Sequence, residues 1–171
     1  MKKIISIALA LITVFALASC GNKIDIPDGF QLASNKVNDY YFFVPTNWTV
    51  DMSTGVSSAY FSETDKTNVS MASYKLSEAM SADAYWEKTK SEYTTLFTEM
   101  SEPEVKTTAL DSVEAKQYTF TGKAGTHALK IMQIFCPKGD TMYVFTYTAT
   151  PEKFEEHYEK VALIISNFRF M

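Results

Sequence analysis

The side chains best suited to nucleophilic or metal chemistry are few in this sequence and lie far apart. It contains two cysteines and two histidines. Cys136 follows the apolar run at residues 131–135 and precedes Pro137. A nucleophilic cysteine needs a neighbouring base, whereas a buried free cysteine packs as a small hydrophobic residue. We therefore expect Cys136 to fill space in the core. His127 follows a glycine-rich turn and is expected at the surface.

His157 lies among glutamates on the last predicted helix, which allows two interpretations: a metal ligand, or a residue on a solvated helix face. The sequence has neither the His-x₃-His nor the His-Glu-x₂-His spacing of metal-binding helices, so we favour the solvated face. It also lacks the nucleophile elbow, the P-loop and the dinucleotide fingerprint. The carboxylates available for an acid–base pair lie in predicted connectors, where charge is ordinary: Glu63, Asp65, Glu102 and Glu104. The sequence thus predicts a non-enzymatic protein without a metal or cofactor.

The N-terminal segment predicts export from the cell. Lys2 and Lys3 precede an almost unbroken apolar run at residues 4–17, and small residues follow it. A positively charged N-terminal region, a short apolar run and small residues after that run are typical of a secretory signal peptide. The run is shorter than the roughly 20 residues needed to cross a bilayer. It can therefore direct export but is a poor permanent anchor.

The exit from this apolar run, Leu17-Ala18-Ser19-Cys20, resembles the lipobox of bacterial lipoproteins. That resemblance implies cleavage between Ser19 and Cys20 and transfer of a diacylglycerol to the cysteine sulfur. The alternative is an ordinary signal peptide followed by a chance cysteine. Two acyl chains make a durable anchor, whereas one gives only marginal binding. We expect an exported protein, held through Cys20 on a bacterial membrane and facing the outside or the periplasm.

Composition separates a signal peptide at residues 1–19, a tether at 20–38 and a folded domain at 39–171. The tether is rich in Gly, Asn, Asp, Ser and Lys, with a short ordered piece possible near Phe30 and Leu32. Loss of Lys2 and Lys3 with the signal peptide changes the net charge from −4 to −6. An acidic surface argues against nucleic acid as a partner.

The domain alternates between β-prone segments and two helices with apolar stripes. Ser81 is suited to cap the first helix, which we expect to reach about Met100, and Thr150 to cap the last, with Pro151 in its first turn. Pro103 blocks continuation of the first helix. Short links join four consecutive strand-like segments, which favours antiparallel neighbours; these segments are 105–110, 113–121, 126–136 and 141–149.

Two of these segments, 128–136 and 142–149, carry apolar residues on both faces of the expected strand. A strand with two apolar faces is covered on both sides. We therefore predict an α+β domain in which an antiparallel β-sheet has helices on both faces, an α/β/α sandwich.

The order of elements resembles the Mog1/PsbP-like fold. The resemblance rests on an opening strand that leads into Val44-Pro45-Thr46-Asn47-Trp48, a long middle helix, the run from Met142 to Phe154, and Ile164-Ile165-Ser166-Asn167-Phe168 at the end. It covers residues 39–171 and implies an antiparallel sheet between helices. Members of the family share binding to larger assemblies, and the fold alone does not carry a function.

Aromatic residues left over from the predicted helix stripes and sheet faces are candidates for a binding surface, since such side chains serve interfaces and sugar stacking. These candidates are Tyr40, Trp48, Tyr60 and Tyr74. We expect an accessory domain that binds an envelope protein or complex. The alternative is a receptor for a small ligand such as a sugar, a peptide or a metal ion, which needs a concave pocket.

The variant Cys20→Ala tests the predicted attachment of the protein to the membrane. Without a sulfur to acylate, the protein should leave the membrane fraction, because the apolar run is too short to hold it. Fractionation of native cells followed by immunoblotting measures this. Retention of the variant in the membrane fraction would contradict lipid anchoring.

Overall fold

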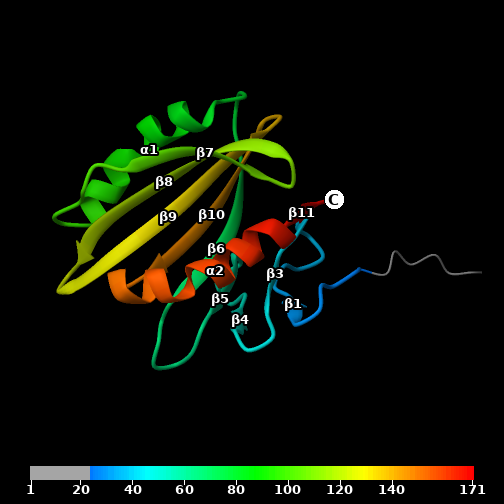
Figure 1. Ribbon diagram of the computed structural model, residues 1–171. Coiled ribbons are helices and arrows are strands. Elements are labelled where there is room, and N and C mark those ends of the chain that lie inside the picture. The colour runs from blue at the N-terminus through cyan, green and yellow to red at the C-terminus, as the bar shows by residue number, and fades with distance from the viewer. Residues whose placement is uncertain (1–23) are drawn as a thin grey trace, which may run out of the picture.

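The computed structural model describes residues 24–171; the predicted signal peptide and Cys20 lie outside them. A seven-stranded antiparallel sheet forms the centre of the fold (Figure 1). Its strands, in spatial order, are β4 (Thr49–Asp51), β5 (Ser57–Tyr60), β6 (Asn68–Lys75), β10 (Thr141–Ala149), β9 (His127–Lys138), β8 (Val113–Ala124) and β7 (Glu104–Leu110). The predicted antiparallel arrangement of the four consecutive strands is confirmed.

Two small strand pairs stand beside this sheet. The first joins β1 (Phe30–Leu32) to β3 (Phe43–Pro45), and the second joins β2 (Tyr40–Tyr41) to β11 (Arg169–Phe170). Both pairs are antiparallel. They bring the first part of the described chain against its last residues, so the two ends of the domain lie close together (Figure 1).

The helices begin where the sequence predicts. The Ser81 hydroxyl accepts the N–H of Ala84 at the start of α1 (Ala82–Leu96), and the Thr150 hydroxyl caps α2 (Pro151–Asn167). Such caps satisfy backbone donors that have no partner within the helix. However, α1 ends at Leu96, earlier than predicted. The Thr98 backbone instead pairs with Lys123 at the end of β8, which draws the chain away from the helix axis.

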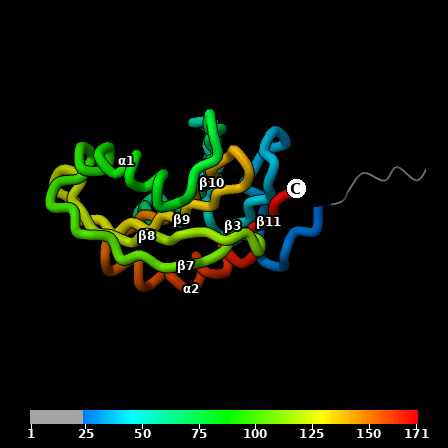
Figure 2. The backbone as a smooth tube through the Cα atoms, turned by 90° about the horizontal axis from the view of Figure 1, so that it is seen from above, coloured from blue at the N-terminus to red at the C-terminus, as the bar shows by residue number. Residues whose placement is uncertain are grey.

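The helices cover opposite faces of the sheet, which confirms the predicted sandwich (Figure 2). On the α1 face, Trp86 packs against Tyr118, Phe120 and Phe135. The larger core lies on the other face, where α2 and the segments from β1 to β3 cover the sheet together. The two faces are therefore covered unequally, because the α1 face has only one helix.

The predicted tether at residues 20–38 requires a correction. Its later part belongs to the domain, since β1 pairs with β3 and Ala33 is fully buried. The Gln31 side-chain amide donates to the Trp48 carbonyl oxygen at 2.7 Å. A short polar segment can pack in this way because its hydrogen bonds are made with the neighbouring chain rather than with water. The ordered piece near Phe30 and Leu32 is thus a strand.

Candidate functional site

Helix α1 leaves part of its face of the sheet uncovered. Helix α1 packs against β8 and β9 and leaves part of the surface of β5, β6 and β10 uncovered. The strand register places one row of polar side chains across this surface: Ser58 opposite Ser70, Ser70 opposite Thr146, and Thr146 opposite Gln133. The three hydroxyl residues are partly exposed. The sheet therefore presents a polar floor beside the helix.

A cavity of about 460 Å³ lies where α1 meets this floor. Ser70, Thr146 and Gln133 of the polar row line it from below. The wall residues come mainly from α1 and from the end of β6; they are Tyr74, Tyr85, Thr89, Glu92 and Tyr93. The volume falls in the range of small-molecule sites, roughly 300–1,000 Å³. We call this space the Gln133 cavity.

Gln133 is the buried polar residue at the centre of the cavity. Only 6% of its surface is exposed. Its Nε2 donates to Thr146 Oγ1 at 3.3 Å, while its Oε1 has no hydrogen-bond partner in the protein. An unsatisfied buried acceptor costs roughly 1–3 kcal/mol, and such groups are uncommon in folded proteins. The carbonyl oxygen is therefore a buried, unsatisfied acceptor on a residue that lines the cavity.

The tyrosines of the cavity are neutral hydrogen-bonding groups. Burial, followed by the nearby Tyr74, Tyr93 and Glu92, raises the pKa of Tyr85 to about 12. Burial also raises the pKa of Tyr93, although hydrogen bonds donated to its oxygen by the side chains of Gln133 and Thr89 oppose that rise. The rings of Tyr74 and Tyr85 lie 6.4 Å apart and 30° from parallel. The phenols of Tyr85 and Tyr93 remain protonated at physiological pH and can donate hydrogen bonds.

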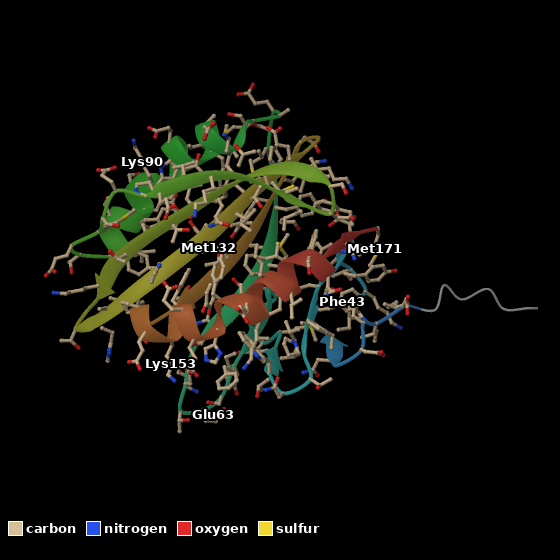
Figure 3. The ribbon with its side chains drawn as sticks, in the orientation of Figure 1. Phe43, Glu63, Lys90, Met132, Lys153 and Met171 are labelled. Carbon is tan, nitrogen blue, oxygen red and sulfur yellow. The ribbon has the colours of Figure 1, made fainter. Side chains whose placement is uncertain are left out.

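A second cleft, of about 710 Å³, lies on the other side of α1, towards β7 and β8. Several of its polar side chains are already paired. The Tyr118 hydroxyl donates to Asp83, and Lys90, which Figure 3 labels, forms an ion pair with Glu87. A ligand there would have to displace existing partners. The Gln133 cavity is therefore the better candidate site despite its smaller volume.

The four aromatic residues predicted to form a binding surface do not come together. Tyr40 and Trp48 are buried, with 1% and 2% exposed, and this corrects their prediction as surface residues. Both belong to the larger core on the α2 face, and the Tyr40 hydroxyl donates to the Met71 carbonyl oxygen at 2.9 Å. Tyr60 at the end of β5 is half-buried and Tyr74 near the end of β6 is exposed, and both lie on the α1 face. Of the four, Tyr74 lines the cavity.

His157 is fully buried, which corrects its interpretation as part of a solvated helix face. Its Nε2 lies 2.9 Å from Asp65 Oδ2 in the loop between β5 and β6, and Phe61 packs on its ring. Glu63 in that loop and Lys153 near the start of α2 lie at the same end of the molecule (Figure 3). The contact between His157 and Asp65 therefore holds this loop against α2.

The Asp65 carboxylate is ionised in this pair. Burial alone raises its pKa, but hydrogen bonds from Thr67 and His157 outweigh that effect and bring the pKa down to about 2. An ionised carboxylate only accepts hydrogen bonds, so His157 Nε2 carries the proton between them. Within residues 24–171, no group of three histidine, cysteine or acidic side chains is arranged to hold a metal ion.

Cys136 is buried, as its sequence context predicts. Its Sγ lies 3.9 Å from the carbonyl oxygens of Val113 and Glu114. Burial raises the pKa of the thiol to about 11. The nucleophilic form is the thiolate, so this cysteine is chemically quiet in the folded protein. His127 is exposed at the start of β9, also as predicted. Among the described helices, none has the length and apolar character that a bilayer crossing requires.

Comparison with solved structures identifies the fold. The solution structure of cyanobacterial PsbP (CyanoP) from Synechocystis sp. PCC 6803 is similar with a TM-score of 0.62 and 14% identity, over 91% of this chain and 99% of that chain. PA94 of Pseudomonas aeruginosa, a protein of unknown function, is similar with a TM-score of 0.56 and 10% identity, over 81% and 94% of the two chains. The chain therefore has a PsbP-like fold, which confirms the predicted fold class.

A weaker similarity, with a TM-score of 0.47 and 10% identity, links 87% of the chain to 82% of LpqN, which is involved in cell envelope biogenesis of Mycobacterium tuberculosis. No protein-family model matches the sequence, and no curated protein matches it significantly. At these identities the similarities concern the fold and not the activity.

The variant Asp65→Asn tests the buried pair through acid unfolding. A folded-state pKa near 2, against an ordinary value of 3.8, means that the carboxylate stabilises the fold above pH 4 and loses this effect as the pH falls towards 2. The variant should be less stable at pH 7 by up to about 2 kcal/mol, and the difference should shrink towards pH 2. Denaturant unfolding from pH 2 to 7 measures it.

Asp140→Asn is the matched control, because Asp140 pairs with Lys75 at an exposed position where an ion pair contributes little. Its stability should follow that of the wild type across the pH range. If Asp65→Asn instead kept a constant difference from the wild type at every pH, the carboxylate would not be the titrating group.

Cys136 should resist alkylation in the folded protein. At pH 8 a thiol with a pKa of about 11 is almost entirely protonated, and burial blocks the reagent as well. We expect iodoacetamide to modify Cys136 only after unfolding in guanidinium, as measured by peptide mass spectrometry. Rapid modification of the native protein would show instead that the thiol is accessible and reactive.

Proposed function

We propose that this protein is a non-enzymatic accessory protein of the bacterial cell envelope, anchored through lipid on Cys20, that acts by binding a ligand in the Gln133 cavity. The observation that carries the proposal is the unpartnered Gln133 Oε1, buried at the floor of a space of ligand size. Pockets with a few convergent polar groups are the usual form of a small-molecule site.

The chemistry of the cavity supports binding rather than catalysis. Glu92 is the one charged residue in its lining, and the phenols of Tyr85 and Tyr93 are neutral at physiological pH. General acid–base catalysis needs a titrating group whose pKa lies near the working pH. Cys136 does not line the cavity, and its thiol is protonated. The site has the means to hold a molecule but little means to transform it.

The sequence predicts two classes of ligand, an envelope protein or a small molecule. The concave shape and size of the Gln133 cavity favour the small molecule. A protein partner has a different point of attachment: β7 is an edge strand of the sheet, and Val105 on it is 47% exposed. A free strand edge can pair with an extended segment of another chain. This second candidate predicts contact at β7 and not at Tyr74.

Site-specific photo-crosslinking in native cells distinguishes these possibilities. The photoreactive residue p-benzoylphenylalanine is placed at Tyr74, at Val105, or at Tyr158 as a matched control that is exposed on α2 across the sheet. We expect a small mass increase of the purified protein only for the Tyr74 position, as measured by intact-mass spectrometry. Capture of a protein at Val105 alone would favour a protein partner at β7 over a small ligand. Capture at Tyr158 alone, and not at Tyr74 or Val105, would contradict the proposal.

A further inference from the structure

We propose that the ligand of the Gln133 cavity is an uncharged glycan, held by the polar floor and by the tyrosines of the wall. This inference rests on the proposed function, and it adds the chemical class of the ligand and the direction in which it lies. Three features of the described residues support it: the hydroxyl-rich floor, the exposed aromatic wall and the near absence of charge in the lining.

The floor matches a molecule covered with hydroxyl groups. Side-chain hydroxyls of Ser70 and Thr146 both donate and accept hydrogen bonds, and the free Gln133 Oε1 accepts one. Sugar hydroxyls have the same double capacity, so each can find a partner here. An apolar ligand would leave the Gln133 carbonyl oxygen buried and unsatisfied, at a cost of roughly 1–3 kcal/mol. The floor therefore favours a polyhydroxylated ligand.

The wall supplies an aromatic surface. Tyr74 is 49% exposed, and its ring tilts by 30° from that of Tyr85. A tyrosine has an apolar ring and a polar tip, a combination that suits ligands with both kinds of surface. A sugar ring has an apolar face of C–H groups and a polar rim. Stacking on Tyr74 would leave the rim free to reach the hydroxyls of the floor.

The charge of the cavity excludes most alternatives. Glu92 gives the lining one negative charge, and the lining contains no basic side chain in the described structure. A phosphate or uronic acid group would meet this carboxylate without a cation to pair with. A cationic ligand would find one acid at the wall but a floor of neutral groups. The complementary ligand is therefore an uncharged sugar, including N-acetylated sugars.

The polar floor extends beyond the cavity. Adjacent strands are about 4.8 Å apart, so the row from Ser58 through Ser70 and Thr146 to Gln133 spans roughly 14 Å. A second row of polar side chains lies about 7 Å along the strands; it consists of Tyr60, Asn68 and Thr148. A single sugar ring is shorter than the first row. The surface fits an oligosaccharide with one unit in the cavity and further units over β5 and β6.

A glycan array tests the inference with the full-length lipidated protein. The protein is extracted in lauryldimethylamine oxide, because a glycosidic detergent would compete for the site. The array carries neutral, N-acetylated, phosphorylated and uronic acid glycans. We expect retention of neutral or N-acetylated oligosaccharides at least tenfold above the acidic ones. The best array glycan is then titrated against variants by calorimetry.

The variants separate recognition from folding. Thr146→Val removes one floor hydroxyl with little change of shape and should weaken binding about tenfold. Tyr74→Ala removes the exposed ring and should weaken it at least as much. Tyr158→Ala, on α2 at the other face, is the control and should bind as the wild type does. Circular dichroism and the Tm of each variant confirm that the fold is retained.

Each other outcome overturns the inference. Equal retention of acidic glycans would contradict an uncharged ligand, and unchanged affinity in Thr146→Val and Tyr74→Ala would place the glycan elsewhere. If no glycan is retained while photo-crosslinking at Tyr74 still captures a small molecule, the ligand class is wrong but the proposed function stands. If neither experiment captures a ligand, both proposals fail.

Discussion

The burial of β9 and β10 on both faces is the constraint on which the rest of the structure depends. Phe135 and Ile134 are adjacent in β9, point to opposite faces and are both fully buried. Such strands need a layer on each side, and the chain supplies one helix for each. Because α1 is the only helix that the described residues place on its face, it covers the central strands of the sheet on that face but leaves the β5–β6 side uncovered. The candidate site lies at the boundary between these regions, where the apolar pattern of the central strands gives way to Gln133 and Thr146.

Much of the fold follows from local rules that the sequence displays. The caps at Ser81 and Thr150, the short links and the two-sided apolar strands each specify an element without reference to distant residues. The predictions that were wrong depend on distant partners. His157 is one position off the apolar stripe of its helix, and its burial is stabilised by Asp65, 92 positions away. The end of α1 is likewise decided by pairing between Thr98 and Lys123.

The candidate site was only partly predictable. Gln133 is a polar residue inside the apolar run at 131–136, which is a sequence signal for a buried polar group with a role. The sequence pattern does not give the position of α1 across the sheet. That position decides whether the Gln133 side chain lies under the helix or beside a cavity. For the same reason, aromatic content could not separate Tyr74, at the cavity, from Tyr40 and Trp48, which are buried in the core on the α2 face.

The packing of β1 also limits where the domain can be. Ile24 lines the same surface pocket as Arg169 and Phe170, and only four residue steps separate it from Cys20. Four residues span at most about 14 Å, so a lipid on Cys20 would keep the domain within a thin layer above the bilayer. A domain confined in this way meets a ligand of the same layer more often than a freely diffusing domain would. The effective concentration of the binding site relative to that ligand is therefore higher. Even a weak intrinsic affinity for an envelope polymer would then give a high occupancy.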